Sequence, residues 1–139
     1  MTNVLASLRW ITGKEFVAKT GTGHSLVIDV PPHWGGANSG PFNAELIAIA
    51  LGGCAGMDVV TILGKRRCAW DRLEFSIESA VADERPTSLR EFVLTCRAWG
   101  TGLTRQDIEA ALALSLEKYC VVAHSLNGRV TTEVVLNDE

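Results

Sequence analysis

Alternating apolar and polar residues open the chain and predict β-structure. Residues 4–11, 16–18 and 25–30 have the alternation that is typical of half-buried strands. Turn-forming residues separate them at 12–15 and at 21–23, where glycines allow the chain to reverse. Because the turns are short, consecutive strands can pair only in opposite directions. The first thirty residues are therefore expected to form an antiparallel meander.

A long loop and a long apolar helix are expected next. Residues 31–43 are rich in Gly, Pro and Asn, and the stretch is too long for a tight turn. Loops of this length often act as lids in compact domains, and Trp34 and Phe42 could cover a site. Residues from about 43 to 65 then predict a helix that is apolar on nearly all sides. Such a helix needs several neighbours to bury it, and a dimer partner could be one of them.

Two further strand-like runs follow this helix. They cover residues 73–82 and 89–99, with a turn-rich segment between them. Since side chains of a strand alternate between its two faces, the second run places four small or apolar residues on one side: Phe92, Leu94, Cys96 and Ala98. Cys96 is therefore expected to pack within a sheet face.

The last third of the chain predicts a capped helix, a short helical segment and a strand. Thr104 and Asp107 have the spacing of a capping box, and apolar residues then repeat at helical intervals to about residue 119. A short helical segment is expected over residues 120–126. Alternation over residues 129–136, after an Asn-Gly turn, predicts a final strand.

Composition narrows the class of protein. A chain of 139 residues with 47% apolar residues is expected to fold as a single domain, 1–139. A net charge of −3 and a pI near 5.6 argue against a nucleic-acid surface. The chain opens without the pattern of a secretory signal, and its longest uncharged apolar run, 46–57, is too short to cross a membrane. We therefore expect a cytoplasmic protein.

Four cysteines offer the most specific chemistry. None has the C-x-x-C spacing of a structural zinc site or a thioredoxin-type motif, and no metal is expected. For Cys68 and Cys96 we expect packing roles, because unpaired cysteines are often buried. Cys54, within the apolar helix, and Cys120 could form a redox pair, in which one sulfur reacts with a peroxide and the other condenses with it. Spacing alone leaves open whether these two are instead unrelated core thiols.

Three segments resemble the OsmC/Ohr family of thiol-dependent hydroperoxide reductases, in its OsmC-like branch. They are GHSLVID (23–29), GPFNAELIAIALGGCAGMDVVTIL (40–63) and SLEKYCVVAHSL (115–126). The resemblance implies an α+β OsmC-like fold, with antiparallel sheets packed around a long buried central helix in an intertwined homodimer. It also implies that Cys54 is the peroxidatic and Cys120 the resolving cysteine, without a bound cofactor.

Activation of Cys54 requires a nearby cation. The helix dipole fades within the first turn, whereas Cys54 lies about three turns into the predicted helix. In the family's peroxidases an arginine from the N-terminal sheet region is held by a glutamate near the start of the central helix. By position, Arg9 or Lys14 corresponds to the arginine and Glu45 to the glutamate. Glu45 precedes Cys54 by nine residues rather than ten, which rotates the carboxylate by about 100° around the helix.

The leading hypothesis is a two-cysteine peroxidase that reduces organic hydroperoxides and is restored by an external dithiol. The shift of Glu45 favours an alternative, an OsmC-fold redox sensor or small-molecule-binding protein with little or no turnover. A cysteine hydrolase would need an oxyanion hole that the sequence does not indicate.

His124, four residues after Cys120, could act as a base. A charged Asp58 would disfavour a thiolate at Cys54 one turn away, so a structural hydrogen bond is expected for Asp58.

Overall fold

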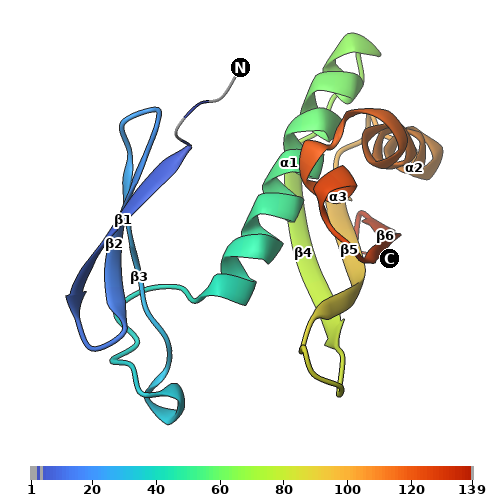
Figure 1. Ribbon diagram of the computed structural model, residues 1–139. Coiled ribbons are helices and arrows are strands. Elements are labelled where there is room, and N and C mark those ends of the chain that lie inside the picture. The colour runs from blue at the N-terminus through green and yellow to red at the C-terminus, as the bar shows by residue number, and fades with distance from the viewer. Residues whose placement is uncertain (1–2, 4, 139) are drawn as a thin grey trace. The chain divides into compact units, whose positions relative to one another are not determined.

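The computed structural model describes residue 3 and residues 5–138. These residues form two compact units, one ending at Ile47 and one beginning at Ala48. A long helix, α1 (Asn43–Lys65), begins in the first unit and continues through the second (Figure 1). Its bounds agree with the prediction from the sequence.

The first unit contains a three-stranded antiparallel sheet. Its strands are β1 (Ala6–Thr12), β2 (Glu15–Thr20) and β3 (Ser25–Ile28), in the order β1-β2-β3. Val17, in the central strand, lies opposite Arg9 on one side and Val27 on the other. The predicted meander is confirmed.

Asp29 organises the loop that follows β3. Its carboxylate accepts hydrogen bonds from the backbone N–H groups of Val30 at 2.8 Å, Ala37 at 3.1 Å and Ser39 at 3.1 Å. These bonds, led by the one from Ser39, hold the pKa of Asp29 below its usual range even though the side chain is buried. A Cβ at Gly36 would collide with the Val30 carbonyl oxygen, so this loop requires glycine there.

The same loop contains a short 3-10 helix, η1 (Pro32–Trp34), that the sequence did not predict. Lys14 Nζ donates a hydrogen bond to the Trp34 carbonyl oxygen at 2.7 Å, and the rings of Trp34 and Phe42 meet edge to face at 5.2 Å. The loop is thus fastened at both its middle and its end. Its role as a lid stays a prediction.

The second unit contains a sheet of mixed direction. Strands β4 (Arg72–Val81) and β5 (Leu89–Trp99) pair antiparallel, while β6 (Arg129–Leu136) pairs parallel to β5. The expectation of antiparallel sheets is therefore wrong for β5 and β6. The cause is the helical connection between these two strands, residues 100–128, which returns the chain to the starting end of β5 before β6 begins (Figure 1).

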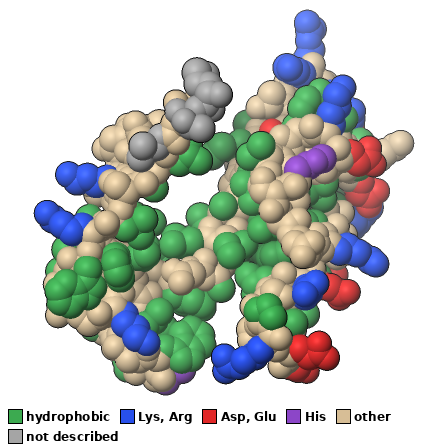
Figure 2. Space-filling view, viewed as in Figure 1, with side chains coloured by type: hydrophobic (Ala, Val, Ile, Leu, Met, Phe, Trp, Pro, Cys, Tyr) green, Lys and Arg blue, Asp and Glu red, His purple; other side chains and the backbone are tan. Residues whose placement is uncertain are grey.

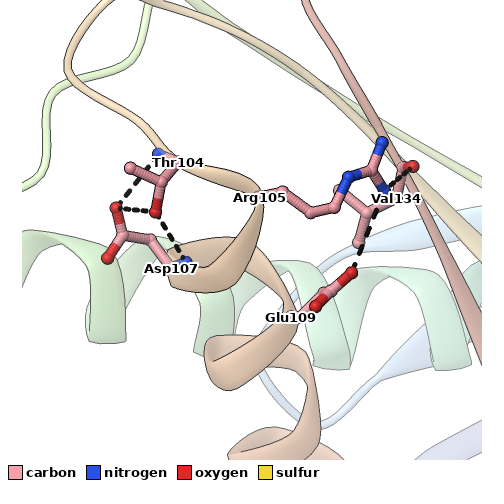
Figure 3. Close-up of polar contacts among 5 residues, drawn as sticks. All are labelled: Thr104, Arg105, Asp107, Glu109 and Val134. Atoms are coloured by element: carbon pink, nitrogen blue, oxygen red, sulfur yellow. Dashed lines mark hydrogen bonds and ion pairs between the residues drawn. The ribbon is translucent and has the colours of Figure 1, made fainter. Parts of the chain in front are cut away.

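That connection contains α2 (Arg105–Leu114), a π-helical turn, η2 (Ser115–Tyr119), and α3 (Val121–Ser125). The predicted capping box is present: Asp107 Oδ2 accepts from Thr104 N at 3.0 Å, while Thr104 Oγ1 accepts from Asp107 N at 3.1 Å (Figure 3). The sequence predicted one regular helix to residue 119. The structure instead widens into a π-turn at Ser115.

The core of the second unit lies between α1, the sheet and α2. The four residues assigned to one face of β5 are all buried, which confirms the position of Cys96 in the sheet face. They meet residues of one side of each helix, and these fully buried helical residues include Ala55, Val59, Leu63, Ile108, Ala111 and Leu112. Arg105 Nη1 donates to the Val134 carbonyl oxygen at 2.7 Å and so ties α2 to β6 (Figure 3).

One side of α1 remains exposed in the chain. Ile49, Gly53, Met57, Val60 and Gly64 follow one another at helical spacing, and we call this set the exposed apolar face of α1. Met57 is 73% exposed and Ile49 62%. Figure 2 shows apolar surface along this part of the second unit. By length and composition alone α1 could cross a membrane, while the side opposite the exposed face, with Leu51, Ala55, Val59 and Leu63, is buried within the chain. The expected burial on all sides is not provided by this chain alone.

Candidate functional site

Cys54 lies in the middle of α1, after two glycines with different surroundings. The Cys54 side chain is half-buried. A Cβ at Gly52 would come within 3.3 Å of Ile77 Cγ1, so Gly52 lets the helix approach β4 closely. A Cβ at Gly53 would meet nothing within 4 Å. One glycine therefore serves packing inside the chain, and the other leaves open surface next to Cys54.

Cys120 is held at the junction of the π-turn and α3. Its side chain is fully buried. Its backbone N–H donates to the Ser115 carbonyl oxygen at 2.7 Å, which is the hydrogen bond that closes the π-turn. Its Sγ caps α3 by accepting a hydrogen bond from Ala123 N at 3.4 Å. The π-turn thus holds the backbone of Cys120, and the first turn of α3 holds its sulfur.

The structure brings the two cysteines together. Cys54 packs against the apolar cluster of Leu51, Phe92 and Cys120, and the two thiols are close enough for Cys54 to affect the pKa of Cys120. Both are free thiols. Burial raises the pKa of the Cys120 thiol, the N–H of Ala123 opposes that rise, and the contact with Cys54 adds to it. The raised pKa keeps the Cys120 thiol protonated at neutral pH.

The other two cysteines are separate from this pair. Cys96 lies in the main core, and burial raises its pKa to about 11. Burial, followed by the neighbouring carboxylate of Asp107, also raises the pKa of Cys68. Both thiols are therefore kept protonated at neutral pH, in agreement with the packing roles expected for them.

Asp58 and Ser115 form a polar contact beside the cysteine pair. Ser115 Oγ donates to Asp58 Oδ2 at 2.8 Å, and the Ser115 side chain is fully buried. Asp58 lies one turn after Cys54 on α1, and the structural hydrogen bond expected for it is present. Sequence reasoning did not identify Ser115 as its partner. The available signal was a serine that continues the apolar stripe of Ile108, Ala111 and Leu112.

His124 does not serve the cysteine sulfur in this structure. Its Nε2 lies 2.9 Å from the Leu116 carbonyl oxygen, and because a carbonyl can only accept, Nε2 is the protonated nitrogen. The imidazole instead stabilises the end of the π-turn. The role as a base, which the sequence left possible for His124, has no support from this arrangement.

Arg9, Lys14 and Glu45 belong to the first unit, so their proposed action on Cys54 stays a prediction. Arg9 is exposed on β1, and Lys14 is bound to the carbonyl of Trp34. Glu45 Oε1 accepts a hydrogen bond from Phe42 N at 3.1 Å, which caps the start of α1. Two of the three candidates therefore have a local structural partner.

A groove of about 500 Å³ opens next to Asp58, between α1 and the end of α2. Ile62, Leu114 and Tyr119 form apolar walls, and Lys65 and Arg66 add positive charge at the end of α1. Within residues 3 and 5–138, no three His, Cys, Asp or Glu side chains gather in a way that could hold a metal ion.

Comparisons with known proteins agree with this architecture. The sequence model of the OsmC-like protein family matches residues 36–135. The protein YhfA of Escherichia coli K12 is 32% identical over 128 residues, which are 90% of each chain. An OsmC-like protein of unknown function from Vibrio cholerae superposes with a TM-score of 0.83 at 18% identity, over 97% of this chain and 100% of the other. The organic hydroperoxide resistance protein OsmC from Legionella pneumophila gives a TM-score of 0.66 at 17% identity, over 94% and 95%.

Proposed function

Because the chain belongs to the OsmC-like family, we propose that it is a thiol-dependent peroxidase that reduces organic hydroperoxides with Cys54 and Cys120. The observation that carries this proposal is the packing of two free thiols, Cys54 and Cys120, in one apolar cluster. Some structural relatives are organic hydroperoxide resistance proteins, which supports the same reaction class.

The reaction proceeds in three balanced steps. The Cys54 thiolate attacks the terminal oxygen of the hydroperoxide, the O–O bond breaks, and an alcohol leaves after taking up a proton. Cys54 is then a sulfenic acid. The Cys120 thiol attacks its sulfur, a disulfide forms and water is lost. An external dithiol restores both thiols by exchange and is itself oxidised to a disulfide.

The position of each thiol suits its proposed step. Cys54 is half-buried, so its side chain is in part accessible to a substrate. Cys120 is fully buried, so the second thiol is protected from peroxide until Cys54 has been oxidised. Apolar neighbours such as Leu51 and Leu116 favour an alkyl hydroperoxide over hydrogen peroxide.

The proposal includes a cation and a partner subunit. Arg9 or Lys14, oriented by Glu45, would stabilise the Cys54 thiolate. A second copy of the chain would cover the exposed apolar face of α1, which is too apolar to remain in contact with water without cause. We place this homodimer in the cytoplasm, where an external dithiol is available.

Treatment of the reduced protein with one equivalent of cumene hydroperoxide tests the function. After the remaining thiols are blocked, non-reducing peptide mass spectrometry locates any disulfide while thiol loss is timed. A Cys54–Cys120 disulfide that forms within seconds supports the proposal. Four free thiols after several minutes would refute it.

A second candidate is a redox sensor or small-molecule-binding protein of the same fold. It is favoured by Glu45, which is shifted by one residue from the position in the family's peroxidases and is engaged by Phe42 N. Slow formation of the same disulfide, without repeated turnover when a dithiol is added, would support this second candidate.

A further inference from the structure

A part-buried hydrogen bond connects the two elements that carry the cysteines. Asp58 lies four residues after Cys54, on the helix that positions this thiol. Its Oδ2 accepts a hydrogen bond from Ser115 Oγ at 2.8 Å. Ser115 is the first residue of the π-turn that ends at Cys120, and its carbonyl oxygen accepts the Cys120 backbone N–H at 2.7 Å. One serine thus binds Asp58 with its side chain and Cys120 with its backbone.

Ser115 is also fixed by the preceding helix. Its backbone N–H donates to the carbonyl oxygens of Ala111 and Leu112 at the end of α2. All three polar groups of this fully buried residue are therefore satisfied, and their directions are set by three different segments. A small movement of Ser115 would be transmitted directly to the backbone of Cys120.

Asp58 has a cost that requires an explanation. A carboxylate one turn from Cys54 opposes negative charge on that sulfur, which a peroxidatic cysteine must acquire. An apolar residue at this position would avoid the repulsion and would also continue the apolar pattern of α1. The hydrogen bond to Ser115 offers the compensating benefit, because it holds the π-turn against the helix next to Cys54.

We propose that Asp58 and Ser115 are positioning residues, whose hydrogen bond holds Cys120 against Cys54 and thereby raises the effective concentration of one thiol toward the other. This inference rests on the proposed redox pair. It adds the hydrogen bond that keeps Cys54 and Cys120 close enough to form a disulfide.

Equilibration with glutathione tests the inference without any peroxide. In this exchange oxidised glutathione takes two electrons from the Cys54 and Cys120 thiols, one protein disulfide forms, and two molecules of reduced glutathione are released. The ratio at equilibrium gives the effective concentration of the thiol pair. Each variant would be measured by quantitative peptide mass spectrometry at the same pH.

Asp58→Ala and Ser115→Ala each remove the hydrogen bond, and each is expected to lower the effective concentration at least about tenfold. Asp58→Asn keeps an oxygen acceptor for Ser115 and is expected to remain within about threefold of the unmodified protein. This rescue separates positioning from charge, because the asparagine lacks the negative charge but keeps the bond. Thr61→Val is the matched control, since it removes a hydroxyl hydrogen bond to Met57 O from the same helix.

The results distinguish this inference from the proposed function. If the unmodified protein forms the disulfide with glutathione but does not consume hydroperoxide, the peroxidase proposal fails and the positioning role stands. If Asp58→Ala and Ser115→Ala keep the effective concentration of the unmodified protein, the positioning role is refuted. It is also refuted if Asp58→Asn falls as far as Asp58→Ala, or if the unmodified protein forms no Cys54–Cys120 disulfide. Circular dichroism would confirm that each variant is folded.

Discussion

Cys54 and Cys120 are far apart in the sequence, yet Cys54 packs against the apolar cluster that contains Cys120. Cys54→Ser is expected to abolish hydroperoxide consumption, because the attacking sulfur is lost. Cys120→Ser is expected to permit one oxidation and then stop at sulfenic or sulfinic acid. The loss of peroxide can be followed by a ferrous oxidation assay and the sulfur state by mass spectrometry.

Cys68→Ser provides the control for this pair of variants, because Cys68 lies in the loop after α1 and outside the cluster of Cys120. It should retain the activity of the unmodified protein within about twofold. Full activity in Cys54→Ser would contradict the assignment of the attacking cysteine.

Burial of Cys96 predicts a loss of stability at alkaline pH. The pKa of this thiol is raised from 9.0 to about 11 in the folded protein. The Cys96 thiol therefore ionises at lower pH in the unfolded chain than in the folded one. Its contribution to the free energy of unfolding is fully present below pH 9 and is lost as the pH rises toward 11. Urea unfolding at several pH values should show the free energy of unfolding falling over this interval.

Cys96→Ala removes the titrating group and should make that decline shallower, even though its cavity lowers stability at every pH. The comparison concerns the slope with pH and not the absolute stability. An unchanged slope in Cys96→Ala would assign the decline to other groups.

The exposed apolar face of α1 predicts the position of the subunit interface. Met57→Glu places a charge in the middle of this face, and burying it without a partner costs several kcal/mol. We expect the dimer to weaken at least about a hundredfold. Sedimentation velocity over a range of concentrations measures this change.

Val81→Glu is the corresponding control, because Val81 is also exposed but lies at the end of β4. It should leave the association constant unchanged. A dimer that tolerates Met57→Glu would place the interface elsewhere.

Asp29 predicts a local effect on its loop. Asp29→Asn replaces one acceptor oxygen by an NH₂ group and removes hydrogen bonds that the carboxylate accepts from Ala37 and Ser39. Amide exchange at these two residues should become at least about tenfold faster, as measured by hydrogen exchange and NMR. Asp83→Asn, in the exposed turn between β4 and β5, should have no such effect.

The lowered pKa of Asp29 gives the same prediction a pH dependence. The contribution of the Asp29 carboxylate to stability is present above its unfolded pKa of 3.8 and is lost as the pH falls through its lower folded pKa. Protection of the loop amides should therefore persist at pH 4 and decrease below it. Equal decreases in the unmodified protein and Asp29→Asn would contradict this role.

The capping box of α2 predicts a difference between two similar substitutions. Thr104→Ala removes the hydroxyl that accepts the Asp107 N–H and should cost about 1 kcal/mol of unfolding free energy. Thr104→Ser keeps the hydroxyl and should cost much less. Urea unfolding compares them, and equal losses would show that the hydroxyl bond is unimportant.

Local signals predicted the ends of several elements correctly. The bounds of α1 and of β6, and the cap at Thr104, agree with the structure because apolar periodicity and capping residues act within a few residues. The π-turn was missed because its register depends on Ser115 binding Asp58, which lies 57 positions away in the sequence. The antiparallel direction expected for the sheets came from the family resemblance, whereas the parallel direction of β6 follows from the helical connection that precedes it.

The candidate site was predicted only in part. Spacing left Cys54 and Cys120 as either a pair or two unrelated thiols, and the resemblance to a known family selected the pair. The two cysteines come close because both pack around Phe92 in the folded chain. The residues next to each cysteine in the sequence do not indicate this contact. Ser115 was missed because a serine in an apolar stripe does not indicate its hydrogen-bond partner, which here lies on another helix.

The parallel pairing of β6 has a consequence for biosynthesis. Val130 of β6 lies opposite Phe92 of β5 and packs against the cluster that contains Cys120. A nascent chain that has emerged only as far as Cys120 lacks this strand, so its wall around the sulfur is incomplete. The two thiols can therefore reach their final environment only after translation has passed residue 130.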